Sequence, residues 1–228
     1  MRYFFSFIVL FLIFFNFSLY AKEYRAEYII EVGGIDIGKL YWEISIKGKK
    51  YSAILKLKDK GLFSGMYKFD GDYRSYGAFI NKGFYPKKYE QVWETRKKKR
   101  VVKLSFKNNF IEKLSINPKE EEGARVSFKE LEKYSDPVSS FLKILNGEKS
   151  SKTIDGRRLY TMVVNDETKE DGKKIKKILI KDYVNIWADH KRNDLKYIEI
   201  FQNKGLDFQM PEEIKIKMKG IKFSLSKV

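Results

Sequence analysis

Apolar and polar positions alternate along most of the chain, which is the pattern of β-strands with one buried and one solvated face. Between residues 40 and 47 the apolar side chains occupy the even positions from Leu40 to Ile46, and polar or exposed ones occupy the odd positions. The same alternation occurs in 24–32, 51–57, 213–219 and 221–226, and further strand candidates lie at 66–80, 84–95, 100–106, 110–116, 157–165, 174–181, 184–188 and 196–202. The pattern predicts a mainly β protein.

One segment, 137–146, has helical periodicity instead. Ser135 or Asp136 can cap its start, Pro137 suits the first turn, and Gly147 suits the exit. The charged stretch before it, 119–133, is typical of a surface loop with at most a short helical turn.

Ten or more strands with one apolar face each are too many for a flat sheet, because large twisted sheets curl or close. We therefore expect a strongly curved antiparallel sheet or an open or closed β-barrel. The principal helix, 137–146, would lie against the concave side or across one end. Aromatic residues make up 16% of the chain, enough either to fill the interior or to line a ligand site. No change in composition divides residues 22–228, so a single domain is expected.

The first 21 residues have the layout of a secretory signal peptide. Arg2 is followed by an apolar run to about Phe15, a more polar stretch, and Ala21 as the cleavage position. The alternative is an uncleaved membrane anchor, but the run is shorter than the roughly 20 residues that a spanning helix needs. No cysteine follows the run, which argues against lipoprotein processing. We expect a soluble periplasmic protein after cleavage.

The chain carries a formal net charge of +17 and contains no cysteine. Disulfides and thiol chemistry are therefore excluded. The lysines are scattered over strands and turns, so nucleic acid is not an expected partner. An exported basic protein does meet anionic lipid head groups and polyanionic glycans, although a solvated lysine surface without a partner explains the charge equally simply.

Catalytic motifs are weak. His190 is the sole histidine, in a predicted turn at 189–194, and no Gly-x-Ser-x-Gly motif accompanies it. We predict no metal site and no cofactor, because zinc ligands are scarce and Asp70-Gly71-Asp72 lacks the rest of a calcium loop. Carboxylates that could serve glycoside hydrolysis are Asp70, Asp72, Glu90, Glu94 and Asp155, and their spacing selects no pair.

Two groups of residues are candidate binding residues. Arg157 and Arg158 follow an Asp155-Gly156 turn and could clamp a phosphate or carboxylate; the alternative is an ordinary hairpin turn with exposed arginines. Tyr85, Tyr89 and Trp93 share one strand parity, so they could line a groove or form part of the core.

Five segments, in order, resemble the domain-of-unknown-function 3108 family of Gram-negative periplasmic proteins. They are Tyr24 to Ile44, Gly71 to Gly77, Gly83 to Glu90, Asp136 to Leu145 and Ile154 to Val164. The resemblance implies a periplasmic β-rich fold and no established chemistry. A further likeness, to half-barrel lipoprotein carriers of the periplasm, is an analogy of fold.

We therefore expect a non-enzymatic binding or carrier module for a lipid-like or amphiphilic envelope component. The alternative is a structural or accessory envelope protein that binds another protein or the cell wall. A third hypothesis is a hydrolase of envelope polymers that uses two carboxylates.

Overall fold

The computed structural model describes residues 21–60, 68–170, 172–187, 194–203, 205 and 208–228. These residues form a single sheet of thirteen strands, in which every neighbouring pair is antiparallel. The strands are β1 (Ala21–Val32), β2 (Ile35–Lys47), β3 (Lys50–Asp59), β4 (Phe69–Ile80), β5 (Gly83–Thr95), β6 (Lys99–Lys107), β7 (Phe110–Asn117), β8 (Ser150–Ile154), β9 (Arg158–Glu170), β10 (Lys173–Asn185), β11 (Leu195–Asn203), β12 (Glu213–Met218) and β13 (Ile221–Lys227). The predicted fold class is confirmed.

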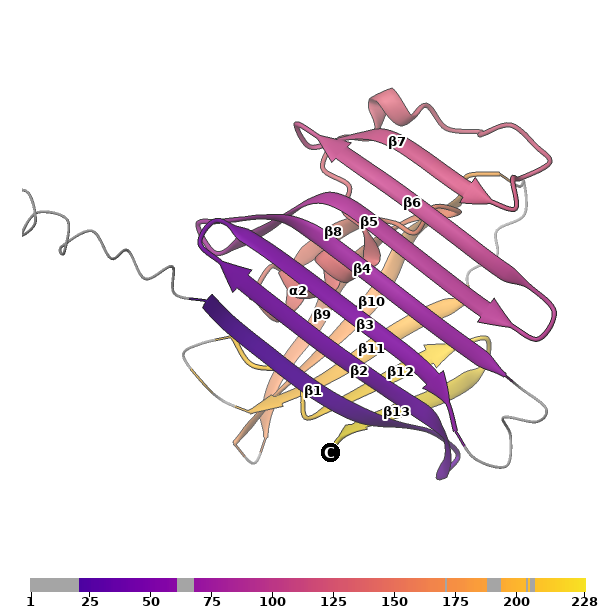
Figure 1. Cartoon of the computed structure of the whole chain (residues 1–228). Coiled ribbons are helices and arrows are strands. Elements are labelled where there is room, and N and C mark those ends of the chain that lie inside the picture. Colours follow the sequence, from indigo (N-terminus) through magenta and orange to yellow (C-terminus); the bar gives the residue numbers. More distant parts are fainter. Residues whose placement is uncertain (1–20, 61–67, 171, 188–193, 204, 206–207) are drawn as a thin grey trace, which may run out of the picture.

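The sheet is folded over on itself but is not closed. Strand β1 pairs with β13, so the two ends of the described chain meet in the middle of the sheet, and β7 and β8 form its two edges. Figure 1 shows strands β1–β7 as one wall and β8–β13 as a second wall behind it. The side chains between the walls therefore lie on the concave face.

The segment between Pro118 and Ser135 crosses the seam between the two edges. Glu132 forms a bridge with Phe110 at the start of β7, and Ser135 forms a bridge with Thr153 on β8. Ser135 also exchanges two backbone hydrogen bonds with β8. This segment contains the short 3₁₀ turn η2 (Phe128–Glu130), in agreement with the loop predicted at 119–133.

The predicted helix is α2 (Pro137–Leu145), and it lies on the concave side (Figure 1). Asp136 is the N-cap, since its carboxylate accepts a hydrogen bond from the backbone N–H of Ser139. Gly147, just beyond the C-cap Asn146, has a φ of 110°, which a residue without a Cβ adopts freely. Both ends of the helix are therefore where the sequence predicts them.

Buried hydroxyl groups fasten the start of α2 to the first wall. Ser139 Oγ lies 2.6 Å from Asp136 Oδ2 and 2.6 Å from the hydroxyl of Tyr51 on β3. Ser75 on β4 donates to the same carboxylate at 2.9 Å. Because the partners satisfy one another, these polar groups can be buried without leaving orphaned donors.

A buried lysine fastens the other end of the helix to the second wall. Lys176 on β10 is 2% exposed, and its Nζ donates to the backbone oxygens of Ile144 at 2.7 Å and Leu145 at 3.3 Å. These carbonyls belong to the last turn, which has no partners within the helix. A cation there also complements the negative end of the helix dipole.

Two parts of the sheet differ from the sequence-based prediction. Strand β8 was missed because its inward side chains are hydroxyls: Ser151 and Thr153 bond Ser140 of α2, so no apolar alternation marks the strand. The segments 174–181 and 184–188 were predicted as separate strands, but β10 continues to Asn185 through an irregularity at Asp182, whose φ is +53°.

The predicted signal peptide, apart from Ala21, lies outside the described residues. So does most of the predicted turn at 189–194, including His190. Among the helices of the described residues, none has both the length and the apolar character needed to cross a bilayer.

Candidate functional site

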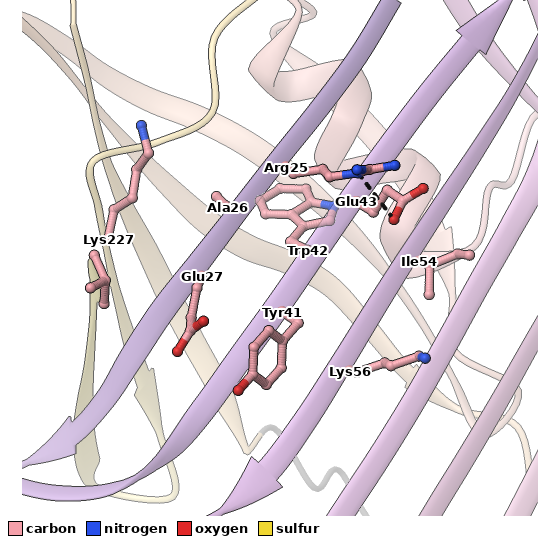
Figure 2. Close-up of a pocket in the computed structure, with 10 residues that line it drawn as sticks. Arg25, Ala26, Glu27, Tyr41, Trp42, Glu43, Ile54, Lys56 and Lys227 are labelled. Carbon is pink, nitrogen blue, oxygen red and sulfur yellow. Dashed lines mark ion pairs between the residues drawn. The ribbon is translucent and has the colours of Figure 1, made fainter.

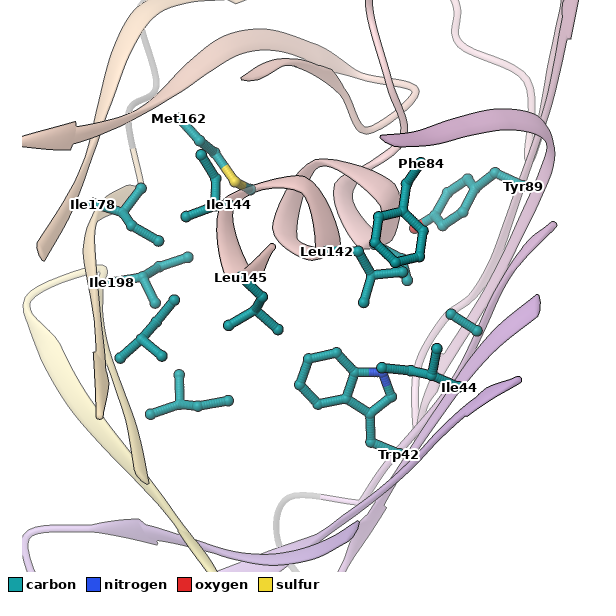
Figure 3. Packing of buried hydrophobic residues seen from close by; sticks show 14 of the residues in the cluster. Trp42, Ile44, Phe84, Tyr89, Leu142, Ile144, Leu145, Met162, Ile178 and Ile198 are labelled. Carbon is teal, nitrogen blue, oxygen red and sulfur yellow. The ribbon is translucent and has the colours of Figure 1, made fainter. Parts of the chain in front are cut away.

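The concave face has a densely packed end, where α2 covers the sheet. Trp42 on β2 is 2% exposed, and its ring lies 5.7 Å from the ring of Phe141 on the helix. Figure 3 shows Leu142 and Leu145 pointing from the helix into the same cluster, with Ile178 and Ile198 on the opposite wall. We call this region the helix end. Its side chains form a filled core.

The other end of the concave face is lined by aromatic rings that stay partly exposed. Phe69 on β4 stacks on Trp93 of β5, with ring centroids 5.9 Å apart and planes 8° from parallel. Tyr73 lies four residues after Phe69 on β4, on the same face of the strand, and is also partly buried. We call Phe69, Tyr73 and Trp93 the aromatic end.

Glycines on β4 and β2 make room for these rings. A Cβ on Gly71 would lie 2.8 Å from the Tyr73 ring and 3.0 Å from the Trp93 ring. A Cβ on Gly38 of β2 would meet Phe69 at 3.0 Å. The rings therefore lie close against the backbone of the sheet, as a flat apolar surface.

Polar groups of the second wall lie near this surface. Asp155 is partly buried, with 20% of its side chain exposed, and its Oδ1 accepts hydrogen bonds from the backbone N–H groups of Arg157 at 2.9 Å and Arg158 at 2.8 Å. Burial raises the pKa of the Asp155 carboxyl, against the opposing effect of Arg158. Tyr160 and Tyr183 stack at 6.4 Å beside it.

The phenol groups around Asp155 remain protonated at neutral pH. Burial raises the pKa of Tyr73 and of Tyr183, and the charge of Asp155 raises both further. The Tyr183 hydroxyl is buried and has no hydrogen-bond partner among the described residues. The region therefore places protonated phenol groups and one partly buried guanidinium beside an apolar surface.

The predicted arginine clamp takes a different form in the structure. Arg157 forms an ion pair with Glu120 of the seam segment, whereas Arg158 Nε lies 3.6 Å from Asp155 Oδ2. Each guanidinium therefore already faces its own carboxylate, and the two do not form a joint clamp. A role of either residue in ligand binding stays a prediction.

The predicted aromatic row on β5 is broken by a bulge. The register shifts opposite Tyr76 and Gly77, so that Tyr85 pairs with Ala78 while Tyr89 pairs with Ser75. An extra residue reverses the alternation. Tyr89 and Trp93 therefore face the interior, whereas Tyr85 is 44% exposed at the rim. The prediction that all three share one face was wrong.

Two grooves lie at opposite ends of the seam. The first, of about 530 Å³, has Tyr85, Tyr134, Lys133, Lys143 and Lys152 among its lining residues; we call it the tyrosine–lysine groove. The second, also about 530 Å³, is lined by Lys97 to Arg100, Pro118 to Glu122, Arg157 and Trp187. We call it the arginine–glutamate groove.

A third hollow, of about 550 Å³, lies on the outer face of β1–β3 (Figure 2). Its charged side chains alternate in sign, and Arg25 Nε lies 3.5 Å from Glu43 Oε2. Tyr41 is 41% exposed there, whereas its neighbour Trp42 is buried on the concave side. The lining has three basic residues, Arg25, Lys56 and Lys227, and two acidic ones, Glu27 and Glu43, and paired surface charges of this kind contribute little to stability.

Four of the five candidate catalytic carboxylates pair with a cation or accept backbone hydrogen bonds, whereas Asp70 is exposed. Asp72 pairs with Arg74, Glu90 with Lys103, and Glu94 with Lys99, while Asp155 accepts two backbone hydrogen bonds. The described residues contain no group of three or more His, Cys, Asp or Glu placed to hold a metal ion. His190 lies outside the described residues.

Sequence reasoning missed Phe69, Tyr73 and Tyr183. The first two could have been found, because Phe69, Gly71 and Tyr73 share the inward parity of a predicted strand. Tyr183 could not, because the irregularity at Asp182 separates it from the alternation of its strand.

Comparison with known proteins places the chain in a family and supports the fold. The solved structure of a β-barrel-like protein of domain of unknown function DUF1849 from Brucella abortus is similar over 90% of this chain and 95% of that one, with a TM-score of 0.51 and 11% sequence identity. No curated protein matches. The family model described as "Protein of unknown function (DUF3108)" matches residues 23–188. Because this match spans more than half of the 228 residues, the chain belongs to the DUF3108 family.

Proposed function

We propose that the protein is an exported, non-enzymatic module that binds or carries a lipid-like or amphiphilic component of the cell envelope. The observation that supports this proposal is the aromatic end: three inward-facing rings that stay partly exposed on the concave face of the sheet. The ligand's apolar part would cover Phe69 and Trp93. Its polar part would lie toward Arg158 and Tyr183.

The hydrophobic effect supplies the driving force. Covering apolar surface contributes roughly 25 cal/mol per Å², and two large rings that already lie flat lose little conformational freedom on binding. The hydroxyl of Tyr73 can donate a hydrogen bond to an anionic or neutral head group, because burial raises its pKa and keeps the proton in place. A few polar groups beside an apolar surface are typical of small-molecule sites.

The periplasmic location in this proposal rests on residues 1–21 alone. Their charged start, apolar run and Ala21 are the features of a cleaved signal. Separation of the envelope fractions and N-terminal sequencing of the exported protein test it: the proposal expects a periplasmic protein that starts at Lys22.

A second candidate function, docking of another envelope protein, is favoured by one observation. Strand β7 is a terminal strand, whereas the edge of β8 is covered by Ser135. A partner strand could add to β7 beyond Phe110. A protein that co-purifies without any small molecule would favour this function.

Native mass spectrometry of protein isolated from the periplasm tests the carrier proposal. We expect wild-type protein to carry an added mass that organic solvent extracts and identifies as an amphiphile. Trp93→Ala should lose most of it. Tyr41→Ala is the matched control, since it removes an exposed ring from the outer face, and it should keep the ligand. Wild-type protein without any added mass, or equal loss in both variants, would contradict the proposal.

A further inference from the structure

We infer that the tyrosine–lysine groove is a second binding site, which takes a phosphate ester through Lys143 and Lys152. The groove is separate from the aromatic end, because Tyr85 was turned out of the interior by the bulge in β5. The inference therefore stands independently of the carrier function proposed above.

Aromatic rings hold the two lysines without neutralising them. Lys143 Nζ, on α2, lies 5.9 Å from the ring centroid of Tyr85. Lys152 Nζ, on β8, lies 5.7 Å from the ring centroid of Tyr134. Both are within reach of a cation–π interaction, which positions an ammonium group but leaves its charge available.

Neither of these ammonium groups has a carboxylate within ion-pair distance among the described residues. The third lysine of the groove, Lys133, approaches Glu132 at 3.7 Å across an exposed pair, which contributes little. Glu148 is the one acidic residue among those that line the described groove. An anion entering the groove would therefore meet at least two uncompensated positive charges.

The groove also offers a hydroxyl donor and space for more than an inorganic ion. Burial, reinforced by the charge of Asp182, raises the pKa of Tyr134, so that its hydroxyl keeps its proton. A volume of about 530 Å³ falls within the range of small-molecule sites, roughly 300–1,000 Å³. Lysine binds phosphate as a point charge, and the exposed face of Tyr85 can contact the organic part of an ester.

The arginine–glutamate groove is equally large, and its lining places three acidic residues beside six basic ones. Glu120 pairs with Arg157 inside the groove, and Lys99 Nζ lies 3.1 Å from Glu94 Oε2. Glu121 and Glu122 add negative charge to the same lining. Since the anion position beside Arg157 is filled by Glu120, this groove serves as the natural control.

Isothermal titration calorimetry of the full exported chain with glycerol 3-phosphate tests the inference. The double variant Lys143→Gln/Lys152→Gln should weaken binding roughly tenfold or more, because each charge-assisted contact typically contributes 1.5–3 kcal/mol and about 1.4 kcal/mol is tenfold. The matched double variant Lys97→Gln/Lys98→Gln removes the same charge from the other groove and should change affinity less than about twofold. Circular dichroism verifies that all variants are folded.

Two further probes distinguish the source of the phosphate. If inorganic phosphate binds saturably and as tightly as glycerol 3-phosphate, the ligand of the groove is the free phosphate ion. If the protein binds phosphatidylglycerol vesicles but not phosphatidylcholine vesicles, and the double variant Lys143→Gln/Lys152→Gln loses this binding, the ligand is a lipid head group. The inference is overturned if neither the two small probes at millimolar concentration nor the phosphatidylglycerol vesicles bind, or if both double variants weaken binding equally. Trp93→Ala should leave this binding unchanged, which separates it from the carrier function.

Discussion

The two ends of the concave face belong to one sheet but differ in what covers them. At the helix end, Trp42 is buried under Phe141 of α2. At the aromatic end, Phe69 and Trp93 stack on each other and stay partly exposed. The alternating pattern that makes a core at one end presents an apolar surface at the other.

Element length explains the difference. Helix α2 has nine residues, about 13 Å at 1.5 Å per residue. Strands β4 and β5 have twelve and thirteen residues, about 40 Å at 3.3 Å per residue. A helix anchored near Ser75 and Lys82 therefore covers only part of these strands, and Phe69, Tyr73 and Trp93 lie beyond it, partly exposed.

The largest effect is expected at the helix end. Trp42→Ala should lower the free energy of unfolding by about 3–5 kcal/mol, because it removes a fully buried ring from a filled core. Urea denaturation measures this change. Tyr41→Ala, one residue away on the outer face, should lower it by less than about 0.5 kcal/mol. Similar losses in the two variants would show that the helix end is not packed as described.

Lys176 should give a pH-dependent difference on the order of 3 kcal/mol between wild type and Lys176→Met. Burial lowers the pKa of this lysine to about 8, with Lys174 and Lys149 adding to the effect and Glu167 opposing it. Between pH 8 and the ordinary value of 10.5, only the unfolded chain binds the proton. The stability of wild type relative to Lys176→Met should therefore rise across that window.

Denaturation of both proteins at a series of pH values checks this expectation. The free energy of unfolding of wild type minus that of Lys176→Met should have its lowest value below pH 8. A difference that stays constant with pH would show that Lys176 is not desolvated by the packing of the helix end.

Asp136→Ala should cost about 2 kcal/mol, since it removes an N-cap and leaves the buried hydroxyls of Ser75 and Ser139 short of an acceptor. Asp136→Asn keeps an oxygen for the Ser139 N–H and should cost less. Thermal unfolding of the two variants measures the order. An Asn variant as unstable as the Ala variant would mean that the cap itself contributes nothing.

Trp93→Ala should have the smallest effect on stability, about 1 kcal/mol, because the ring is half-exposed and loses one stacking partner. Its effect on ligand binding should be large in comparison. Urea denaturation measures the loss of stability, and the amount of extracted lipid measures the loss of ligand binding. A stability loss as large as that of Trp42→Ala would make the aromatic end an ordinary part of the core.

Much of the fold could be predicted from the sequence, for identifiable reasons. The helix was found with both caps because Asp136, Pro137 and Gly147 each satisfy a local requirement. Most strands were found because one face of each is apolar. Strand β8 was not found, since Ser151 and Thr153 are buried against a serine of the helix rather than against apolar side chains.

The site was less predictable, because it depends on register and on tertiary pairing. Tyr89 and Trp93 share one face of β5, as their common parity predicts, but the bulge that turns Tyr85 outward leaves no apolar signal. The partner of Arg157 is Glu120, 37 positions away, and no spacing rule connects them. The lysines of the tyrosine–lysine groove come together only when the seam forms.

Site-specific fluorescence quenching tests the central claim, that the aromatic end holds the apolar part of an amphiphile. Two single-tryptophan proteins are compared, one retaining Trp93 and one retaining Trp42, with the other tryptophans replaced by phenylalanine. A dibrominated stearate, added to delipidated protein, should quench Trp93 strongly and Trp42 little, because bromine quenches only at short range. Equal quenching of the two, or quenching of neither, would contradict the account.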